Sequence, residues 1–400
     1  MKTEIYTGCV GNAPEIIKNG GVVGIPTETV YGLAANGLDE EAVAKIYEVK
    51  GRPEVKPLAL MVPDETYIDR YCRDVPEAAR LLAKKFWPGP LSIVLKARTD
   101  VVPSIVRAGG ETVSLRCPAS PLTLEALKES GVPFAAPSAN PSGSPSPKTA
   151  ADVLGYFSGK IDAVIDGGEC SLGIESTIIS MSSTPYRILR QGALSADEIR
   201  QTLADGLKII GITGGSGTGK TTVLESLRSR GALILDCDEI YHELLSGCRP
   251  MLDELKARFP AAFEEDSFNR KKLGSIVFSD EAALKDLNAI THKYVLEETF
   301  RRLGDFAMNG GAIAGIDAVE LISSGIAEKC TAVFGVTASR ENRIRRIMAR
   351  DGISREYAEK RIDAQRSDEY YARNCTYILE NNSGKEELIA DFNDKLKGVL

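Results

Sequence analysis

One stretch in the second half of the chain carries the residue types and the spacing of a phosphate-binding loop. From residue 209 to residue 222 it reads Ile-Ile-Gly-Ile-Thr-Gly-Gly-Ser-Gly-Thr-Gly-Lys-Thr-Thr. The β-branched run before the glycines predicts a buried strand, and the pattern after them predicts a helix from Val223 to Arg230 that Gly231 closes. Strand, glycine loop, Lys-Thr and helix together form the context that such a loop requires.

Each residue type in this loop has a chemical reason. Glycines let backbone N–H groups converge on phosphate oxygens, and the positive end of the helix dipole strengthens the attraction. Lys220 places a full charge on the β- and γ-phosphates, and the hydroxyl of Thr221 can coordinate Mg²⁺. We therefore predict a site for ATP with Mg²⁺, with contacts from Gly215, Ser216, Gly217, Thr218, Gly219, Lys220, Thr221 and Thr222.

Two carboxylates follow the next predicted strand, Leu233 to Leu235. Asp236 and Asp238 would stand at the carboxyl end of that strand, where open α/β sheets place their ligands. A carboxylate there can accept the proton of a hydroxyl that attacks the γ-phosphate, or hold Mg²⁺ through water. We assign the general-base role to Asp238, with a helix N-cap as its alternative, and expect the two side chains to point to opposite faces.

The composition narrows the chemistry that remains available. The 400 residues suggest two or three domains, and the net charge of −7 gives no sign of a nucleic-acid-binding stripe. No apolar run has membrane-spanning length, no signal-peptide pattern opens the chain, and the 8 cysteines form no Cys-x-x-Cys pair. We therefore expect a cytoplasmic protein with reduced thiols. Only 2 histidines occur, so catalysis must rely on carboxylates, lysines, arginines, hydroxyls and bound Mg²⁺.

The first half of the chain mixes short apolar strands with helices, which predicts an α/β sheet. The clearest helix runs from Glu40 to Val49, and the predicted strands are Gly20 to Ile25, Leu58 to Val62, Val113 to Arg116, Ala163 to Asp166 and Thr177 to Ser180. The segment from Pro137 to Pro147, rich in Pro and Ser, has two interpretations. Its composition is typical of a flexible linker, but Pro and small side chains also suit an ordered loop that leaves room for a ligand.

Four separated motifs stand out in this half. They are Pro-Thr-Glu-Thr-Val-Tyr-Gly-Leu at 26–33, Lys-x-Arg-Pro at 50–53, Ser-x-Asn at 138–140 and Gly-Ile-Glu-Ser-Thr at 173–177. In this order they resemble the threonylcarbamoyl-AMP synthase (YrdC) family, and the resemblance covers nearly all of residues 1–200. It implies a twisted α/β sheet with a deep positive cleft, and ATP, L-threonine and bicarbonate as substrates. The implied product, threonylcarbamoyl-adenylate, reaches adenosine in tRNA through downstream threonylcarbamoyl-transfer proteins.

The resemblance also implies which residues bind these substrates. Lys50 and Arg52 are expected to be the catalytic cations, because the reaction gathers a triphosphate, a carboxylate and bicarbonate. Arg116 would suit a bidentate grip on the amino-acid carboxylate, its alternative being an ordinary ion pair. Met61 departs from the polar residue, often His, that the family places at a threonine contact. ATP contacts are implied for Arg52, Lys56, Thr112, Ser138, Asn140, Ser146 and Arg190, and threonine contacts for Thr27, Arg116, Ala136 and Ser176.

A short helix is predicted to close the first half. It runs from Ser195 to Leu203, with Ser195 as its N-cap and Glu198 completing a capping box. The Ala-Asp-Gly that follows is too short for a disordered tether. We therefore place the boundary near residue 206, which gives domains at 1–205 and 206–400.

The second domain carries further motifs beyond its phosphate loop. They are Asp-x-Asp at 236–238, Asn-Arg-Lys-Lys-Leu-Gly at 269–274, Leu-Asn-Ala-Ile-Thr-His at 287–292, Arg-Asp-Gly-Ile-Ser at 350–354, Arg-Ile-Asp-Ala-Gln at 361–365 and Asn-Asn-Ser-Gly at 381–384. Over about 207–400 they resemble the dephospho-coenzyme A kinase family. That implies a P-loop kinase domain with a parallel sheet flanked by helices, and γ-phosphate transfer to the 3′-hydroxyl of dephospho-coenzyme A (dephospho-CoA).

On this resemblance Lys220 and Asp238 are catalytic and Asn381 contacts adenine. Arg346 and Arg350 would be lid arginines on one helix face, with a solvated surface as their alternative. Three acceptor-side features depart from the family: His242 replaces Arg, His292-Lys293 replaces His-Pro, and the segment from Asp317 to Leu321 differs from Asp-x-Pro-Leu-Leu-x-Glu.

We therefore expect a bifunctional enzyme with two independent ATP sites. Two alternatives remain. The second domain could phosphorylate another acceptor, or the first half could be an RNA-binding module without catalysis. The Lys50, Arg52, Ser138 and Asn140 set speaks against the RNA-binding alternative.

Overall fold

The computed structural model describes residues 2–264, 267–278 and 280–400. These residues form two compact units. The first reaches Leu203 and takes in Met308–Gly310, and the second comprises Ala204–Ala307 and Gly311–Leu400. Helix α7 (Ala196–Asp205) contains the point of division. Its predicted capping box is confirmed, because Glu198 N donates to Ser195 Oγ and Ser195 N donates to the Glu198 carboxylate.

The first unit is built on a mixed sheet of ten strands, in the order β1-β8-β2-β3-β7-β4-β6-β5-β9-β10. Parallel and antiparallel neighbours both occur, as at β4 beside β6 and at β5 beside β6. In chain order the strands are β1 (Glu4–Thr7), β2 (Val23–Ile25), β3 (Gly32–Asn36), β4 (Ala59–Met61), β5 (Leu91–Lys96), β6 (Thr112–Arg116), β7 (Phe134–Ala135), β8 (Ala163–Asp166), β9 (Thr177–Ser180) and β10 (Arg187–Arg190). The predicted strands are confirmed as elements, although the one expected from Gly20 begins only at Val23.

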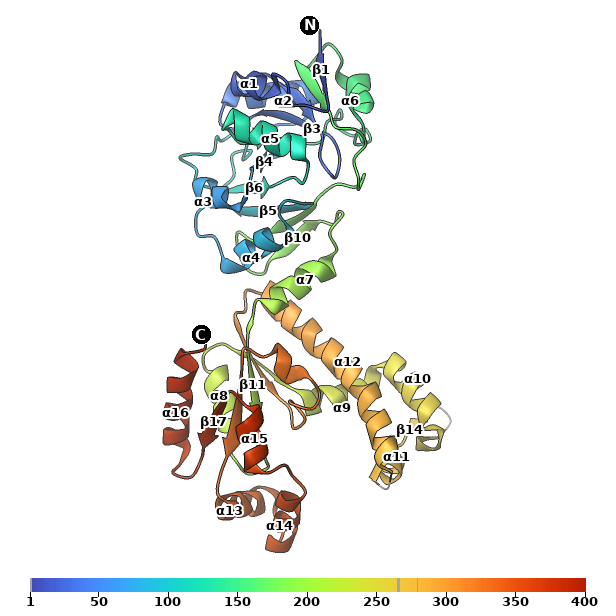
Figure 1. The fold of residues 1–400 in the computed structure, drawn as a ribbon, viewed down its shortest axis with the longest axis vertical. Coiled ribbons are helices and arrows are strands. Elements are labelled where there is room, and N and C mark those ends of the chain that lie inside the picture. Colours follow the sequence, from blue (N-terminus) through green and yellow to red (C-terminus); the bar gives the residue numbers. More distant parts are fainter. Residues whose placement is uncertain (1, 265–266, 279) are drawn as a thin grey trace. The chain divides into compact units, whose positions relative to one another are not determined.

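Helices cover this sheet where their apolar faces can be buried (Figure 1). Ala13 and Ile17 of α1 and Ala126 and Leu127 of α5 pack with side chains of β2 and β8 in one core cluster. The helices of the unit are α1 (Ala13–Lys18), α2 (Glu40–Lys50), α3 (Ile68–Tyr71), α4 (Glu77–Phe86), α5 (Pro121–Ser130) and α6 (Ala150–Phe157), with a 3₁₀ turn, η1, at Glu65–Tyr67.

The second unit contains a five-stranded sheet in the order β12-β15-β11-β16-β17, and every neighbouring pair is parallel. The strands are β11 (Lys208–Thr213), β12 (Leu233–Asp236), β15 (Ile313–Asp317), β16 (Ala332–Thr337) and β17 (Tyr377–Glu380). Strand β11, which leads into the phosphate loop, is the central one. Leu224 and Leu227 of α8 and Phe392 of α16 pack against β11 and β16, so the sheet and its flanking helices share one core.

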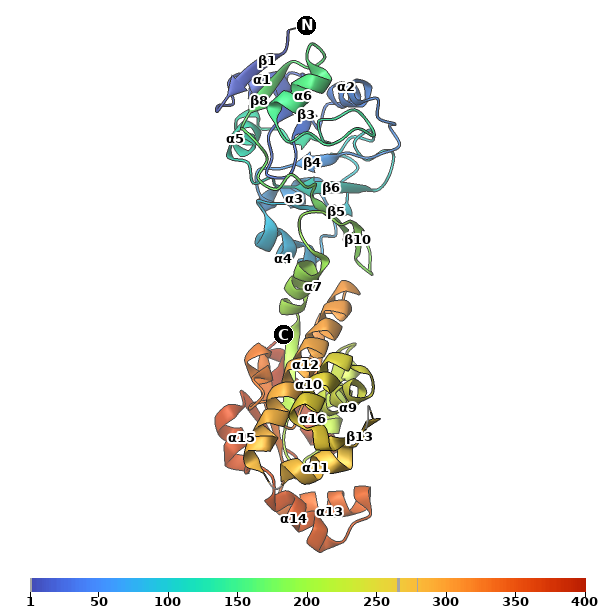
Figure 2. The same ribbon diagram turned by 90° about the vertical axis from the view of Figure 1, so that its right-hand side faces the viewer.

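Several of the remaining helices form two smaller groups (Figure 2). Met251, Leu273 and Tyr294 join α10, α11 and α12 in a satellite core, and Ile347 and Ile362 join α13 to α14. The helices are α8 (Lys220–Arg228), α9 (Cys237–Gly247), α10 (Arg249–Arg258), α11 (Arg270–Phe278), α12 (Glu281–Met308), α13 (Arg340–Asp351), α14 (Arg355–Asp363), α15 (Asp368–Asn374) and α16 (Lys385–Lys397). The 3₁₀ turns η2 (Pro260–Ala262) and η3 (Ile326–Lys329) and the hairpin β13 (Phe263–Glu264) and β14 (Ser267–Phe268) complete the unit.

Two local expectations in this unit are wrong. Helix α8 begins at Lys220 and ends at Arg228, with Gly231 (φ +82°) three residues beyond its end. The expectation that Asp236 and Asp238 point to opposite faces fails, because residues two apart on a strand share a face and because only Asp236 ends β12. Asp236 caps α9, accepting the N–H groups of Asp238 and Glu239. Asp238 therefore lies in the first turn of a helix.

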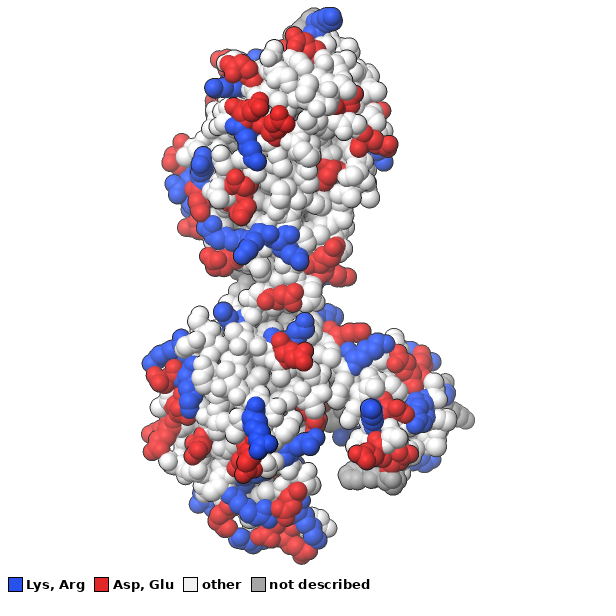
Figure 3. Space-filling model, viewed as in Figure 1, with Lys and Arg blue, Asp and Glu red and all other residues white. Residues whose placement is uncertain are grey.

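The surface and the thiols agree with the composition. Acidic and basic side chains are interspersed on the face of the second unit that Figure 3 shows. No helix among the described residues combines the length and the apolar character needed to span a bilayer. All 8 cysteines of the chain are free thiols.

Candidate active sites

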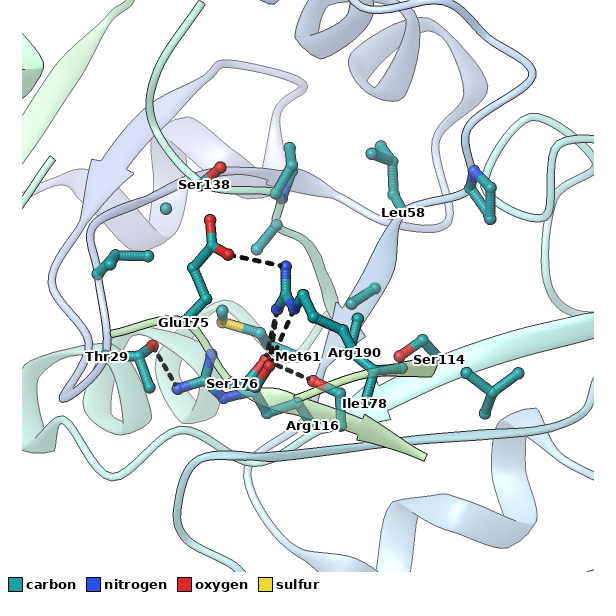
Figure 4. Close-up of a pocket in the computed structure, with 18 of the residues that line it drawn as sticks. Thr29, Leu58, Met61, Ser114, Arg116, Ser138, Glu175, Ser176, Ile178 and Arg190 are labelled. Carbon is teal, nitrogen blue, oxygen red and sulfur yellow. Dashed lines mark hydrogen bonds and ion pairs between the residues drawn. The ribbon is translucent and has the colours of Figure 1, made fainter. Parts of the chain in front are cut away.

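A cavity of about 270 Å³ opens in the first unit (Figure 4). Its charged lining consists of three arginines, Arg52, Arg116 and Arg190, and one carboxylate, Glu175. Such a wall suits a ligand with several negative groups, because guanidinium groups form strong charge-assisted hydrogen bonds with carboxylates and phosphates.

Strand β6 contributes three polar side chains to this cavity. Thr112, Ser114 and Arg116 alternate onto the cavity face, while Val113 and Leu115 are buried on the other face. The hydroxyl of Ser114 is buried and has no hydrogen-bond partner among the described residues. Because a buried polar group without a partner is costly, Ser114 marks a position where a ligand can supply one.

Arg116 is held on two of its three nitrogens. Its Nη2 donates to Glu28 Oε1 at 2.6 Å and to Thr29 Oγ1 at 2.8 Å, and its Nε donates to Gly89 O at 3.3 Å. This leaves Nη1 as the nitrogen without an acceptor among the described residues. A bidentate grip on a carboxylate through two nitrogens is therefore not available in this arrangement, since only Nη1 has no acceptor among the described residues.

Lys50 lies beneath the cavity wall and not in it. The left-handed Gly51 ends α2 and turns the chain, so Lys50 stays in the last helical turn while Arg52 reaches the cavity. The Lys50 ammonium donates to the backbone carbonyls of Ser138 and Asn140. Burial, and then the charge of Arg52, lowers the pKa of Lys50 to about 8.

The predicted residues of the first unit separate into two groups. Those that line the cavity together are Arg52, Thr112, Arg116, Ala136, Ser138, Ser176 and Arg190, and Met61 joins them as an apolar neighbour. Lys50, Thr27, Asn140, Ser146 and Lys56 do not line it. Thr27 and Asn140 are buried and bond within the chain, to Val30 O and to Ser144 O, whereas the Lys56 side chain is exposed.

The phosphate loop of the second unit has the predicted conformation. Gly217 (φ +79°) and Gly219 (φ +106°) lie in the left-handed region, where a side chain would strain the backbone. Lys220, at the start of α8, donates to Gly214 O at 3.1 Å and lies 4.0 Å from Asp317 Oδ1. Both Lys220 and the loop line a cavity of about 310 Å³.

Two residues that the sequence did not single out contact this loop. Gln365 Oε1 accepts from the backbone N–H of Ser216 at 2.9 Å, and Gln365 Nε2 donates to Ser216 Oγ at 2.9 Å. Arg343, which is buried, donates to Gln365 Oε1 at 2.7 Å and to Ser216 O at 3.1 Å. Gln365 is the last residue of the Arg-Ile-Asp-Ala-Gln motif at 361–365, and that motif was the sequence signal that could have marked it as a contact of the loop.

The structure separates the two predicted lid arginines. Arg346 donates to Gly217 O at 3.2 Å and to Asn381 O at 3.0 Å, so it braces the loop. Arg350 pairs instead with its neighbour Asp351 at 2.7 Å and is exposed. Asn381 is buried behind the loop, where its Nδ2 donates to Thr218 O at 2.7 Å.

Three carboxylates meet at the carboxyl edge of the second sheet. Asp236 of β12 is in register with Asp317 of β15, and Asp238 follows in α9. Burial, and then the charge of Asp236, raises the pKa of Asp238. Burial also raises the pKa of Asp317 to about 6, although Lys220 opposes the shift.

Comparison with known proteins separates the same two halves. A family model for Sua5, YciO and YrdC, described as telomere recombination, matches residues 15–192, and the dephospho-CoA kinase model matches residues 208–387. A dephospho-CoA kinase from Geobacter sulfurreducens is 36% identical over 184 residues, which are 46% of this chain and 93% of that protein. A putative threonylcarbamoyl-AMP synthase from Mycobacterium tuberculosis is 35% identical over 187 residues, which are 47% of this chain and 85% of that protein.

This chain belongs to the Sua5/YrdC family in its N-terminal half and to the dephospho-CoA kinase family in its C-terminal half. A threonylcarbamoyl-AMP synthase from Pyrococcus abyssi is 45% identical over 193 residues. The match covers 48% of this chain and 56% of that protein, so the chain spans little more than half of its length. The two resemblances read from the motifs are confirmed.

The kinase-family half contains a further cavity, of about 240 Å³, that Asp238, His292 and Ala318 line. Val319 and Glu320 line both this cavity and the one at the phosphate loop, so the two are adjacent. One of the departures from the family, Ala318, thus lines this cavity, beside His292, which the family shares. Lys293 instead pairs with Glu254 at 3.1 Å.

Proposed function

We propose that the Sua5/YrdC half forms L-threonylcarbamoyladenylate from L-threonine, bicarbonate and ATP. The observation that supports this most directly is the cavity with three arginines in its wall. In the reaction, the threonine amine and bicarbonate form a carbamate with loss of water. A carbamate oxygen then attacks the α-phosphate as pyrophosphate leaves. Anions are present at each stage, and fixed guanidinium groups stabilise them.

The residues divide this work by position. Arg116 offers Nη1 to the threonine carboxylate, with Ser114 and Ser176 as neighbouring hydroxyls. Arg52 and Arg190 serve the phosphates. Lys50 holds the loop that carries Ser138, and it contributes positive charge from below.

Pyrophosphate release that depends on both threonine and bicarbonate tests this function. We expect the full chain to show it and Arg52→Ala to lose it, because a fixed cation leaves the cavity wall. Fluorescence of Trp87, which lies in the first unit, shows that this unit of the variant is folded. RNA binding without such release would favour the non-catalytic alternative.

We propose that the kinase-family half transfers the γ-phosphate of ATP to the 3′-hydroxyl of dephospho-CoA. The supporting observation is the position of Asp238, whose cavity adjoins the one that holds Lys220. Its raised pKa suits a base that must accept the hydroxyl proton during the reaction. Lys220 and the loop amides bind the phosphates.

The residues present fit Mg²⁺, the usual partner of ATP. Asp317 Oδ1 is buried and has no hydrogen-bond partner in the part of the chain that the structure describes. Carboxylate, hydroxyl and phosphate oxygens are the ligands that Mg²⁺ prefers. Asp317 and Thr221 would hold the ion. Bound Mg²⁺ neutralises charge on the transferred phosphate.

A panel of acceptors tests the kinase assignment. Dephospho-CoA should be phosphorylated far faster than adenosine, AMP or pantetheine 4′-phosphate. Preference for another member of the panel would support the alternative of a different acceptor, and the altered residues His242, Lys293 and Ala318 would then be the positions to exchange.

We place both activities in the cytoplasm, which the eight free thiols support. The adenylate would pass to tRNA through separate threonylcarbamoyl-transfer proteins.

A further inference from the structure

Glu175 is the exception in the cavity of the first unit. Every other charged side chain that lines this cavity is an arginine, yet the predicted ligand is a triphosphate. A carboxylate facing phosphates would repel them, so its presence needs a reason.

The contacts of Glu175 supply a reason. Its Oε2 lies 3.4 Å from Arg190 Nη1, a pairing that Figure 4 shows. Its Oε1 accepts from Ser146 Oγ at 2.8 Å. Arg190 and Ser146 are both predicted ATP contacts, and they come from separate segments of the chain. One carboxylate therefore occupies two donors that phosphate oxygens would otherwise use, since both kinds of oxygen accept the same hydrogen bonds.

The backbone of Glu175 is held by close contacts, whereas its side chain is partly exposed. Ala193 N donates to Glu175 O at 2.9 Å, and a Cβ on Gly192 would lie 2.2 Å from that carbonyl. The Glu175 and Arg190 side chains are each 40% exposed, so a solute can reach the pair. The remaining nitrogens of Arg190 donate to Ser176 O at 3.1 and 2.9 Å, which keeps the guanidinium in place without Glu175.

We propose that Glu175 is a built-in counter-ion of the ATP site. It is a positioning residue: it pairs with Arg190 and Ser146 before ATP arrives, while Ser176 O keeps the Arg190 guanidinium in place, and it then releases both donors to the phosphates. This rests on the proposed synthase function. This arrangement lowers the affinity for ATP, because ATP must displace the Glu175 carboxylate.

Calorimetric titration with inorganic pyrophosphate tests this, in buffer without divalent cations. The full chain carries Lys220→Ala throughout, so that the phosphate loop of the second unit contributes little. We expect Glu175→Gln, which keeps the shape and the acceptor for Ser146, to bind pyrophosphate more tightly by a factor on the order of 10. Glu175→Ala should change the affinity in the same direction.

Glu169→Gln is the matched control. Glu169 is exposed and does not line the cavity, so this variant loses the same net charge elsewhere and should bind as the parent does. In turnover, Glu175→Gln should lower KM for ATP and leave KM for threonine unchanged, a split that a merely structural role would not produce. Fluorescence of Trp87 checks folding of the first unit.

Unchanged or weaker pyrophosphate binding in both Glu175 variants would overturn the proposal. So would an affinity loss that appears only when Mg²⁺ is added, because Glu175 would then be a metal ligand. In a further outcome, the parent releases no pyrophosphate in the presence of threonine, while Glu175→Gln still binds pyrophosphate more tightly than the parent does. That result would overturn the synthase function and support the counter-ion role of Glu175.

Discussion

Lys50 shows how far the surroundings of a residue can change its expected role. The Lys-x-Arg spacing indicated two cations in contact with anions, but Gly51 turns the chain between them. Arg52 reaches the cavity, whereas the Lys50 ammonium donates hydrogen bonds to the carbonyls of Ser138 and Asn140. In the proposed reaction, Lys50 would therefore act through the loop whose carbonyls it bonds.

We expect kcat/KM of the synthase for ATP to fall above about pH 8. Below that pH Lys50 is charged and bonds the loop carbonyls, and above it the proton is lost, because burial lowers the pKa of Lys50 to about 8. Since kcat/KM reports the free enzyme, a pH profile of threonine-dependent pyrophosphate release measures this directly. Lys50→Arg should remove this decline at high pH. The kinase activity of the same chain should not show the decline. If kcat/KM still falls above about pH 8 in Lys50→Arg, titration of Lys50 is excluded as the cause.

Asp238→Asn should lower the kinase turnover number by a factor on the order of 10²–10⁴, with ATP affinity little changed. A base acts on the acceptor hydroxyl in the transition state, so its loss affects turnover. Asp236→Asn is the control, because asparagine keeps the oxygen that caps α9. Steady-state kinetics and direct ATP titration give both quantities. Equal turnover losses in the two variants would mean that the carboxylates act together on a metal.

Asp317→Asn should stabilise the second unit at neutral pH. The pKa of Asp317 is raised from 3.8 to about 6, so ionisation destabilises the folded state: the cost is absent below pH 3.8, grows between these values and is complete above pH 6. The variant should gain on the order of 2 kcal/mol at pH 7.5 and nothing near pH 3.8. Thermal unfolding by circular dichroism measures this. The only tryptophan, Trp87, lies in the first unit, so its fluorescence transition should not move. Equal stability at pH 7.5 would contradict the shift.

At the scale of elements, hydrogen bonding decides between interpretations that composition leaves open. The segment from Pro137 to Pro147 reads as a linker or as an active-site loop. Leu33 N donates to Pro137 O, Tyr31 N donates to Pro147 O, and Ser142 N donates to Lys50 O. With its ends and its middle bonded to distant backbone, the segment is an ordered loop, and its Ser138 lines the cavity.

The link from α14 to the phosphate loop should limit ATP binding in the kinase-family half. Gln365 accepts the Ser216 N–H that the loop motif assigns to a phosphate oxygen. Gln365→Ala should therefore tighten binding of a non-hydrolysable ATP analogue, by a factor on the order of 10 for the displaced hydrogen bonds. Gln365→Glu, which adds a negative charge beside Arg343, should weaken it. A titration in which Gln365→Ala binds the analogue more tightly than the parent, and Gln365→Glu more weakly, would support competition between Gln365 and the phosphate. Weaker binding in both variants would instead make Gln365 an ATP ligand.

At the scale of the whole molecule, each site is complete within its own half. The residues that line the first cavity fall between Thr29 and Arg190, and those at the phosphate loop fall between Gly214 and Tyr371. Neither proposed product is the other enzyme's substrate, which gives no chemical reason for channelling.

Lys220→Ala should therefore abolish kinase activity and spare the synthase, and Arg52→Ala should do the reverse. Each change removes one fixed cation from one phosphate site. Assays of the full chain and of the two halves cut at residue 206 measure this independence. Loss of both activities in a folded single variant would show that the sites depend on each other.

The sequence by itself determined the two families, the α/β class, the phosphate loop and most of the strands that carry the sites. These features rest on local patterns, such as apolar periodicity, glycine spacing and contiguous motifs. Such patterns can be recognised without knowing which residues contact one another in the fold. Only the tertiary structure decided which predicted residues share a cavity. It separated Arg346 from Arg350, placed Lys50 beneath the wall, and brought Glu175 to Ser146 and Gln365 to Ser216. Those pairings join residues far apart in the chain, and burial and hydrogen-bond partners across such distances leave no periodic signal in a single sequence.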